Sequence, residues 1–181
     1  MTSAADSMQH LLHELLRLSR IGRIVNPSER VPFGEVVREA AGLVRARLEE
    51  RRVRLVIDAD LPVVYGDRLR LVEVAQNLLE NAAKFAGDQP SPVVRVGVRA
   101  GASGCPPVLL VEDNGIGIDP RFHEKVFGLF EKLDPRAEGS GVGLALVRRI
   151  VEVHGGRAWI ESAGRGNGTT VCLTLPLPPP G

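Results

Sequence analysis

Apolar residues recur at helical spacing in several long stretches of the chain and form short β-rich runs between them. The helical spacing predicts helices at residues 3–22, 34–52, 67–85 and 120–127, and another that follows residues 139–143 and runs through residue 153. The β-rich runs predict strands at residues 53–58, 63–65, 93–98, 108–111, 157–161 and 169–175. A Gly- and Pro-containing segment separates the third and fourth runs, so we expect these two to pair antiparallel. Residues 128–138 lack any such period, and we expect this segment to be mobile.

The predicted helix 67–85 carries two different faces. Its apolar face holds Leu71, Val74, Ala75, Leu78 and Ala82, and another face holds Glu73, Asn77, Asn81 and Lys84. Carboxamide oxygens can ligate Mg²⁺ without adding negative charge beside a polyphosphate, and the Lys84 ammonium can offset the phosphate charge. The pattern therefore indicates a site for a phosphate with its metal. Taken alone, it is equally consistent with a solvated polar face.

The composition limits the function classes. A chain of 181 residues that is 44% hydrophobic and 25% charged predicts one globular domain with a real core. The net charge of +1 gives no electrostatic case for binding nucleic acid. Cys105 and Cys172 lack CxxC spacing, which argues against a metal knuckle. No apolar run approaches the roughly 20 residues that span a bilayer, so we expect a soluble, cytoplasmic piece.

The glycine-rich stretch 139–143 precedes the last predicted helix. Glycines at a helix N-terminus let backbone N–H groups approach an anion, aided by the positive end of the helix dipole. The spacing Gly-x-Gly-x-Gly is neither a Walker A loop nor the Rossmann fingerprint. A phosphate cradle and a structural turn both remain open for this stretch.

Asp113 stands where a predicted strand gives way to a loop that contains Gly115 and Gly117. A carboxylate there can accept a hydrogen bond from the exocyclic amine of adenine, whereas guanine would present an acceptor and be repelled. The two glycines would let the chain pass close beneath a flat base. The alternative is an Asx turn at Asp113.

Four stretches, in order, resemble the N, G1, F and G2 boxes of sensor histidine kinases. They are NLLENAAKF (77–85), VEDNGIGI (111–118), KVFGLFEKL (125–133) and EGSGVGLALVRRIVEVHGG (138–156). ESAGRGNGTTVCLTLP (161–176) resembles the hairpin that closes the domain. The resemblance, to the catalytic ATP-binding domain of the Bergerat or GHKL superfamily, covers about residues 31–177. Unrelated chains should rarely carry all these boxes in order.

The resemblance implies an α+β fold, a two-layer α/β sandwich of a mixed sheet and helices with a flexible ATP lid at residues 118–138. It also implies ATP and Mg²⁺ as ligands. Asn77 would ligate Mg²⁺, Asn81 and Lys84 would contact phosphates, Phe85 would lie beside the base and Asp113 would read adenine. Gly139, Gly141, Gly143 and Leu144 would form the lid hinge and phosphate cradle, Thr169 would support the acid, and Lys125, Lys132 and Arg136 are further candidate phosphate contacts.

Glu73 stands four residues before Asn77. The gyrase and Hsp90 relatives of the superfamily carry a water-activating glutamate there, whereas many histidine kinases carry Gln. A catalytic role for Glu73 and a role as a metal-shell or structural residue are equally consistent with the sequence.

Residues 1–24 resemble the end of the second helix of a dimerisation and phosphotransfer domain, because LLRLSR at 15–20 matches the common LLxLSR ending. The phospho-accepting helix is absent from this chain. His13-Glu14 resembles the start of an acceptor box, but Leu18 replaces the expected proline. His10 and His123 have weaker claims. His154 ends a predicted helix, where an interaction with the helix dipole is a sufficient explanation.

We therefore interpret residues 25–177 as the ATP-binding catalytic domain of a two-component sensor histidine kinase, followed by a tail at 178–181. It would present Mg-ATP for γ-phosphoryl transfer to a histidine outside this chain, and by itself only bind ATP. Expected partners are the acceptor-histidine domain of the same parent protein, then a response regulator, and a second copy through the apolar stripe of residues 3–22. The alternatives are a GHKL-type ATPase, an anti-sigma-like serine kinase and a nucleotide-dependent interaction module. The parent is either soluble or membrane-anchored.

Overall fold

The structure is a computed structural model that describes residues 26–102, 104–133 and 139–180. The predicted helix 3–22, His10, His13 and Arg136 lie outside the described residues. Within the described ranges, no helix combines the length and apolar character that crossing a membrane requires.

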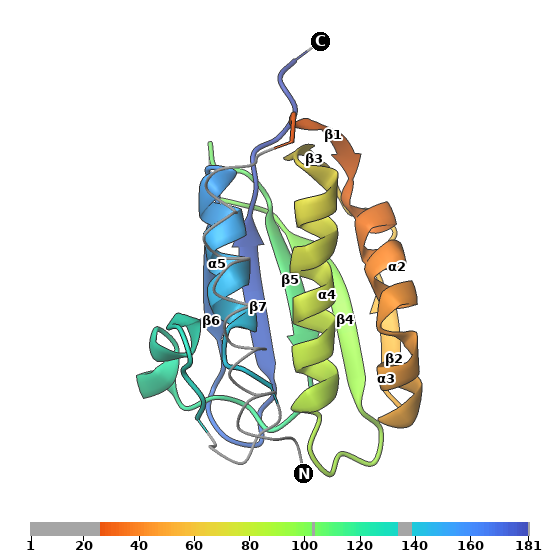
Figure 1. The fold of residues 1–181 in the computed structure, drawn as a ribbon, viewed down its shortest axis with the longest axis vertical. Helices are drawn as coiled ribbons and strands as arrows, with labels where there is room; N and C mark the ends of the chain where they lie inside the picture. The colour runs from red at the N-terminus through yellow and green to blue at the C-terminus, as the bar shows by residue number, and fades with distance from the viewer. Residues whose placement is uncertain (1–25, 103, 134–138, 181) are drawn as a thin grey trace, which may run out of the picture.

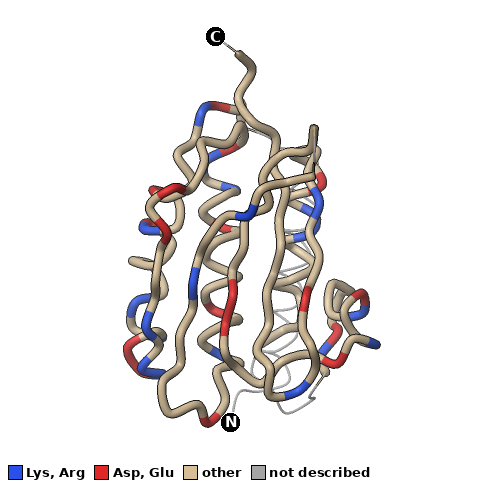
Figure 2. Tube along the Cα trace, turned by 180° about the vertical axis from the view of Figure 1, so that it is seen from behind, with Lys and Arg blue, Asp and Glu red and all other residues tan. Residues whose placement is uncertain are grey.

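The described residues form two layers (Figure 1). A five-stranded mixed sheet has the order β2-β4-β5-β7-β6, in which β2 and β4 are parallel and the other neighbours antiparallel. Its strands are β2 (Arg54–Ile57), β4 (Val93–Arg99), β5 (Val108–Asp113), β6 (Arg157–Glu161) and β7 (Thr169–Thr174). Helices cover one face, and the view from behind in Figure 2 shows the strands without helices in front of them. The predicted mixed sheet packed against helices is therefore confirmed, as is the antiparallel pairing of β4 with β5.

Helix α4 (Arg68–Lys84) is the middle helix of the layer, with α2 (Phe33–Leu43) on one side and α5 (Gly143–Val153) on the other (Figure 1). All five residues of its predicted apolar face are buried. Val72, Leu79 and Ala83 are buried as well. The apolar face is wider than predicted because α4 is covered by neighbours on more than one side.

One prediction about the first half of the chain is wrong. The predicted helix 34–52 breaks at Val44, which separates α2 from α3 (Arg45–Glu50). Val44 has φ −104° and ψ 9°, outside the helical range, and it is buried at 4% exposure while Leu43 is 62% exposed. The break thus turns the chain so that both Val44 and Leu48 reach the core. The apolar period runs through the break and does not reveal it.

A second, two-stranded sheet was not expected. It pairs β1 (Glu29–Pro32) antiparallel with β3 (Val63–Gly66). Strand β1 has four residues, of which only Val31 is buried, and two prolines lie nearby. Its sequence therefore shows no alternation of apolar and polar residues from which a strand could be predicted. The tail after β7 lies against this sheet, where the Tyr65 N–H donates to the Pro176 carbonyl at 2.8 Å.

The segment between β5 and α5 also differs from its prediction. In place of a helix at 120–127 there are two short 3₁₀ turns, η1 (Pro120–Phe122) and η2 (Lys125–Phe127). Asp119 caps the first, because its Oδ1 accepts from the Arg121 backbone N–H at 3.0 Å. Val126 and Phe127 anchor the second in the core.

Candidate functional site

A cavity of about 660 Å³ opens between α4, the start of α5 and the ends of β5 and β7. The predicted site residues that line it come from distant parts of the chain. They are Asn77, Asn81, Lys84, Phe85, Asp113, Gly117, Lys132, Gly139, Gly141, Gly143, Leu144 and Thr169. The fold therefore brings the N, G1 and G2 stretches to one place.

Helix α4 contributes the amide and ammonium groups of the cavity. The Asn77 side chain donates from Nδ2 to the Glu73 carbonyl at 2.8 Å, which leaves the Oδ1 atom as the group that faces Gly143. Two turns further on, Lys84 places its ammonium 4.6 Å from the centre of the Phe85 ring. The helix thus presents a carboxamide oxygen and a cation along the same wall.

The glycine-rich loop closes onto these α4 side chains. A methyl group at Gly139 would lie 3.3 Å from the Lys84 Nζ atom, and one at Gly143 would lie 2.9 Å from the Asn77 Oδ1 atom. Gly139 and Gly141 have φ of +97° and +75°, which favour glycine. Their backbone can therefore come close both to α4 and to an anion in the cavity, where the N-terminus of α5 begins.

Asp113 ends β5 and stands directly opposite Thr169 of β7. Burial is the main effect and raises its carboxyl pKa from 3.8 to about 6, although hydrogen bonds from the backbone N–H groups of Gly115 and Thr169 act in the opposite direction. The Gly115 N–H donates to Asp113 Oδ1 at 2.8 Å. The carboxyl is held by the backbone of its neighbours, and Asp113 lines the cavity.

Gly115 and Gly117 serve close packing of the loop after β5. A methyl group at Gly115 would lie 2.2 Å from the Phe85 carbonyl oxygen, and one at Gly117 would lie 2.2 Å from the Gly164 carbonyl oxygen. Gly117 lines the cavity, whereas Gly115 is not among its lining residues. The first glycine therefore brings the loop onto the end of α4, and the second lets it pass under the cavity.

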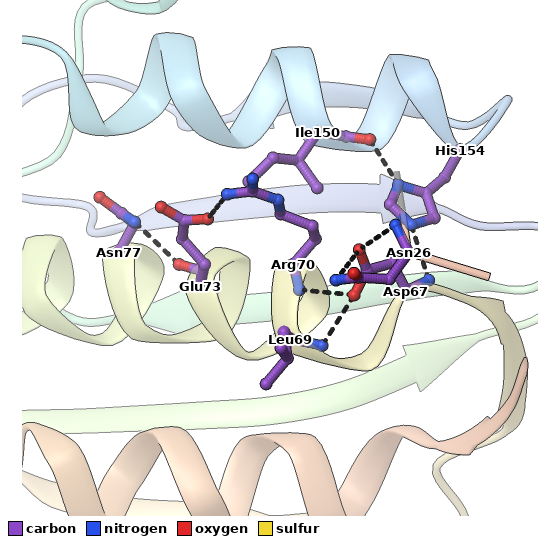
Figure 3. Close-up of polar contacts among 8 residues, drawn as sticks. All are labelled: Asn26, Asp67, Leu69, Arg70, Glu73, Asn77, Ile150 and His154. Atoms are coloured by element: carbon purple, nitrogen blue, oxygen red, sulfur yellow. Dashed lines mark hydrogen bonds and ion pairs between the residues drawn. The ribbon is translucent and has the colours of Figure 1, made fainter. Parts of the chain in front are cut away.

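Three predicted site residues in the described part of the chain are not among the cavity lining, namely Gly115, Glu73 and Lys125. Glu73 forms an ion pair with Arg70 at 2.8 Å (Figure 3). Lys125 pairs with Glu131 at 3.4 Å. Arg136 lies outside the described residues. A catalytic role for Glu73 and a phosphate contact for Lys125 both stay predictions, and this arrangement does not support either of them.

The cavity is also lined by residues that the sequence did not predict as site residues, although Leu78 and Ala82 belong to the predicted apolar face of helix 67–85. They are the polar residues Arg47, Gln76, Glu80, Glu131 and Ser140 and the apolar residues Leu78, Ala82, Val111, Ile116, Ile118, Val126, Leu133, Ile160 and Val171. The apolar ones form a surface suited to a flat base, and most sit in predicted strands or helices whose burial was expected. Arg47 comes from α3, and no motif marks it.

The two described histidines make contacts with the backbone. His123 Nε2 lies 3.3 Å from the Ile118 carbonyl oxygen. His154 Nε2 accepts from the Asp67 backbone N–H at 2.9 Å, and its Nδ1 lies 2.7 Å from the Ile150 carbonyl oxygen. This pattern fits a neutral imidazole with the proton on Nδ1. His154 therefore links two helices, which is more than the predicted interaction with a helix dipole.

The oxygen donors of the cavity are compatible with Mg²⁺. The described residues contain no cluster of three or more His, Cys, Asp or Glu side chains that would hold a metal ion by themselves. Mg²⁺ in nucleotide sites usually keeps several waters and takes only one or two protein oxygens besides the phosphates. The Asn77 Oδ1 atom, fixed by its own amide hydrogen bond, fits that requirement.

Comparison with known proteins agrees with this geometry. A model of the family "Histidine kinase-, DNA gyrase B-, and HSP90-like ATPase" matches residues 66–179. The chain is 53% identical to the methanogenesis regulatory histidine kinase FilI of Methanothrix harundinacea, over 97% of this chain and 19% of FilI. This chain thus spans about a fifth of the length of that relative.

Solved structures share the fold. The mycobacterial sensor histidine kinase MprB matches with a TM-score of 0.69 and 30% identity, over 84% of this chain and 99% of that one. Full-length ShkA in complex with AMPPNP matches with a TM-score of 0.75 and 24% identity, over 95% of this chain and 36% of that one. The chain therefore belongs to the histidine kinase-, DNA gyrase B- and HSP90-like ATPase family and contains an ATPase domain of the histidine kinase type.

Proposed function

We propose that this chain is the nucleotide-binding module of a two-component sensor histidine kinase, which presents MgATP to a histidine on another domain. The observation that carries the proposal is the single cavity in which the α4 amides, the glycine-rich loop and Asp113 meet. A metal-ligating amide, an anion cradle and a base-reading acid are the three parts that ATP requires.

Each part has a distinct task. Asn77 Oδ1 would hold Mg²⁺, whose positive charge screens the phosphates when it is bound. Asn81 and Lys84 would contact the phosphate oxygens, together with the backbone of the loop from Gly139 to Gly143. Asp113 would accept from the adenine amine, with Thr169 fixing its position. Lys132 lines the same cavity and is a further cation for the phosphates.

The module would contribute positioning and charge neutralisation. In the reaction, an imidazole nitrogen of the acceptor forms a bond to the γ-phosphorus, the bond from that phosphorus to the bridging oxygen breaks, and ADP leaves. We place the acceptor in a separate domain of the parent, which residues 1–24 would join to residues 25–177. A response regulator would then receive the phosphoryl group, in the cytoplasm.

The test is phosphoryl transfer to a separately supplied acceptor-histidine domain. Labelled ATP with this chain should give an acid-labile phosphoprotein, and Asn77→Ala should abolish the label. Label on serine would favour the serine kinase alternative. An absence of label, despite nucleotide binding, would favour the interaction module.

The ATPase alternative depends on Glu73 as a base for water. Glu73 is instead paired with Arg70 and is not among the cavity-lining residues, which argues against this role. The test is phosphate release from ATP by this chain, with Glu50→Ala at the last residue of α3 as the control. Release that is lost in Glu73→Ala but kept in Glu50→Ala would reverse that conclusion.

A further inference from the structure

Asp67 is the one charged residue among the described residues that is buried, at 2% exposure. One carboxylate oxygen, Oδ1, caps the start of α4 by accepting from the backbone N–H groups of Leu69 at 3.1 Å and Arg70 at 3.4 Å. A buried carboxylate needs partners for its other oxygen as well, because an unmatched acceptor is costly there.

The partner of that other oxygen is the chain that enters the domain. Asp67 Oδ2 accepts from the Asn26 backbone N–H at 3.2 Å and from the Asn26 side-chain Nδ2 at 2.9 Å. Asn26 is the first described residue and follows directly on residues 1–25. The helix cap of α4 is thus shared with Asn26, which precedes β1 in the sequence.

A third element meets the same point. The Asp67 backbone N–H donates to His154 Nε2 at 2.9 Å, and His154 stands at the end of α5 (Figure 3). Gly66 leaves room for this ring, because a methyl group there would lie 2.6 Å from the His154 Cδ2 atom. Asn26, Asp67 and His154, which we call the linker joint, therefore tie the incoming chain to the start of α4 and the end of α5.

The same two helices meet again at the nucleotide cavity. Asn77 stands ten residues after Asp67 on α4, about 15 Å along the axis at 1.5 Å per residue, and its Oδ1 atom lies against Gly143 at the start of α5. Between these points the Arg70–Glu73 ion pair lies along the seam of α4 and α5 (Figure 3). The Glu73 carbonyl then holds the Asn77 amide at 2.8 Å. Polar contacts thus run from the linker joint to the candidate metal ligand.

We propose that the linker joint is a regulatory site, in which Asn26 is a positioning residue for MgATP binding. The position that the preceding segment imposes on Asn26 sets how α4 lies against α5, and this alignment sets the affinity of the cavity for nucleotide. Because coupling between two sites is reciprocal, bound nucleotide stabilises the contacts of the linker joint by the same free energy by which the joint strengthens nucleotide binding. The inference rests on the proposed function, since it concerns the same nucleotide site and the segment at residues 1–24.

The test breaks the joint and then repairs it. Asn26→Asp places a second carboxylate against Asp67 and should detach the incoming chain from the cap. Adding Asp67→Asn restores a donor opposite the new carboxylate, and Asn remains a good helix N-cap. Titration of the 181-residue chain with Mg²⁺ and a non-hydrolysable ATP analogue should show about three- to tenfold weaker binding for the single variant and recovery of most of that loss in the double variant.

A matched control separates regulation from general destabilisation. Arg95→Ala removes the Arg95–Asp58 ion pair of β4 and the end of β2, which takes no part in the joint. It should lower thermal stability without changing nucleotide affinity. Equal affinities for the wild type and the Asn26→Asp variant, or a loss that Asp67→Asn does not repair, would overturn the inference while leaving the proposed function intact. Failure of the wild type to bind the analogue would overturn both.

Discussion

Gly143, the first residue of α5, lies so close to Asn77 on α4 that a methyl group at Gly143 would stand 2.9 Å from the Asn77 Oδ1 atom. The Asn77 amide cannot swing away freely, because its Nδ2 donates to the Glu73 carbonyl at 2.8 Å. The missing side chain at residue 143 is therefore what lets the carboxamide oxygen face the cavity.

Gly143→Ala is expected to weaken Mg²⁺-dependent nucleotide binding by about tenfold, or roughly 1.4 kcal/mol, because the added methyl group displaces the Asn77 oxygen. Isothermal titration with ADP in the presence and absence of Mg²⁺ measures this directly. The loss should be larger with the metal than without it. An equal loss under both conditions would show that the methyl group acts on the phosphates and not through Asn77.

Gly42→Ala provides the matched glycine substitution in a helix. Gly42 lies in α2, where an added methyl group would meet no atom within 4 Å. Alanine should stabilise the fold by about 0.5 kcal/mol, because it restricts the unfolded chain and favours the helix. Urea unfolding should show the gain, and nucleotide affinity should stay at the wild-type value.

Asp113→Asn is expected to stabilise the nucleotide-free chain while weakening adenine nucleotides. Burial raises the pKa of Asp113 from 3.8 to about 6, so keeping this carboxyl ionised opposes folding by at most about 3 kcal/mol. The penalty is complete above about pH 6 and disappears as the pH falls towards 4, because the folded state then binds the proton first. Thermal unfolding at pH 7.5 and pH 4.5 should show that the advantage of Asn over Asp shrinks in acid.

The same pKa predicts how adenine binding depends on pH. The ionised carboxylate is the stronger acceptor for the adenine amine, so ADP affinity should fall as the pH drops through about 6. The Asp113→Asn variant should bind weakly and without this dependence. A wild-type affinity that stays constant from pH 7.5 to 5 would remove Asp113 from the role of reading the base.

The parts of the site that could be predicted are those whose residues lie close together in the sequence. Asn77, Asn81 and Lys84 share one face of one helix, so the period of 3.6 residues is enough to group them. The pairing of Asp113 with Thr169 is different, because it depends on the register of strands 56 residues apart in sequence. Only the resemblance to a family brought these two residues together.

Other features have no local signal at all. The side chain of Glu73 points to Arg70 and forms an ion pair with it. The helical period places Glu73 on a face of α4 but does not tell whether its side chain points to a ligand or to Arg70. Arg47 lines the cavity from α3, which follows the break at Val44, and the apolar pattern does not reveal that break. The linker joint joins Asn26, Asp67 and His154 from three distant segments, and it becomes visible only when tertiary structure places them together.

Glu161 should give a pH effect of opposite sign to that of Asp113. Hydrogen bonds from Arg99 and then from Trp159 lower its pKa from 4.5 to about 2. Its contribution is present above about pH 4.5 and is lost as the pH falls towards 2. Because the side chain is 44% exposed, solvent screening limits that contribution to less than about 1 kcal/mol. Glu161→Gln should therefore lower stability slightly at pH 7 and change the emission of Trp159, the single tryptophan, whose Nε1 donates to Glu161 at 3.0 Å.

The two cysteines should differ sharply in reactivity. Cys105 is exposed, whereas Cys172 is buried, and burial raises the pKa of the Cys172 thiol to about 12. Because the thiolate is the reactive form, a disulfide reagent at pH 8 should modify one thiol per native chain quickly and the second only after unfolding in denaturant. Cys105→Ser should remove the fast phase and leave the slow one. Rapid modification of both thiols in the native chain would mean that β7 opens readily. The pairing of β7 with β5, which places Thr169 beside Asp113, would then be transient.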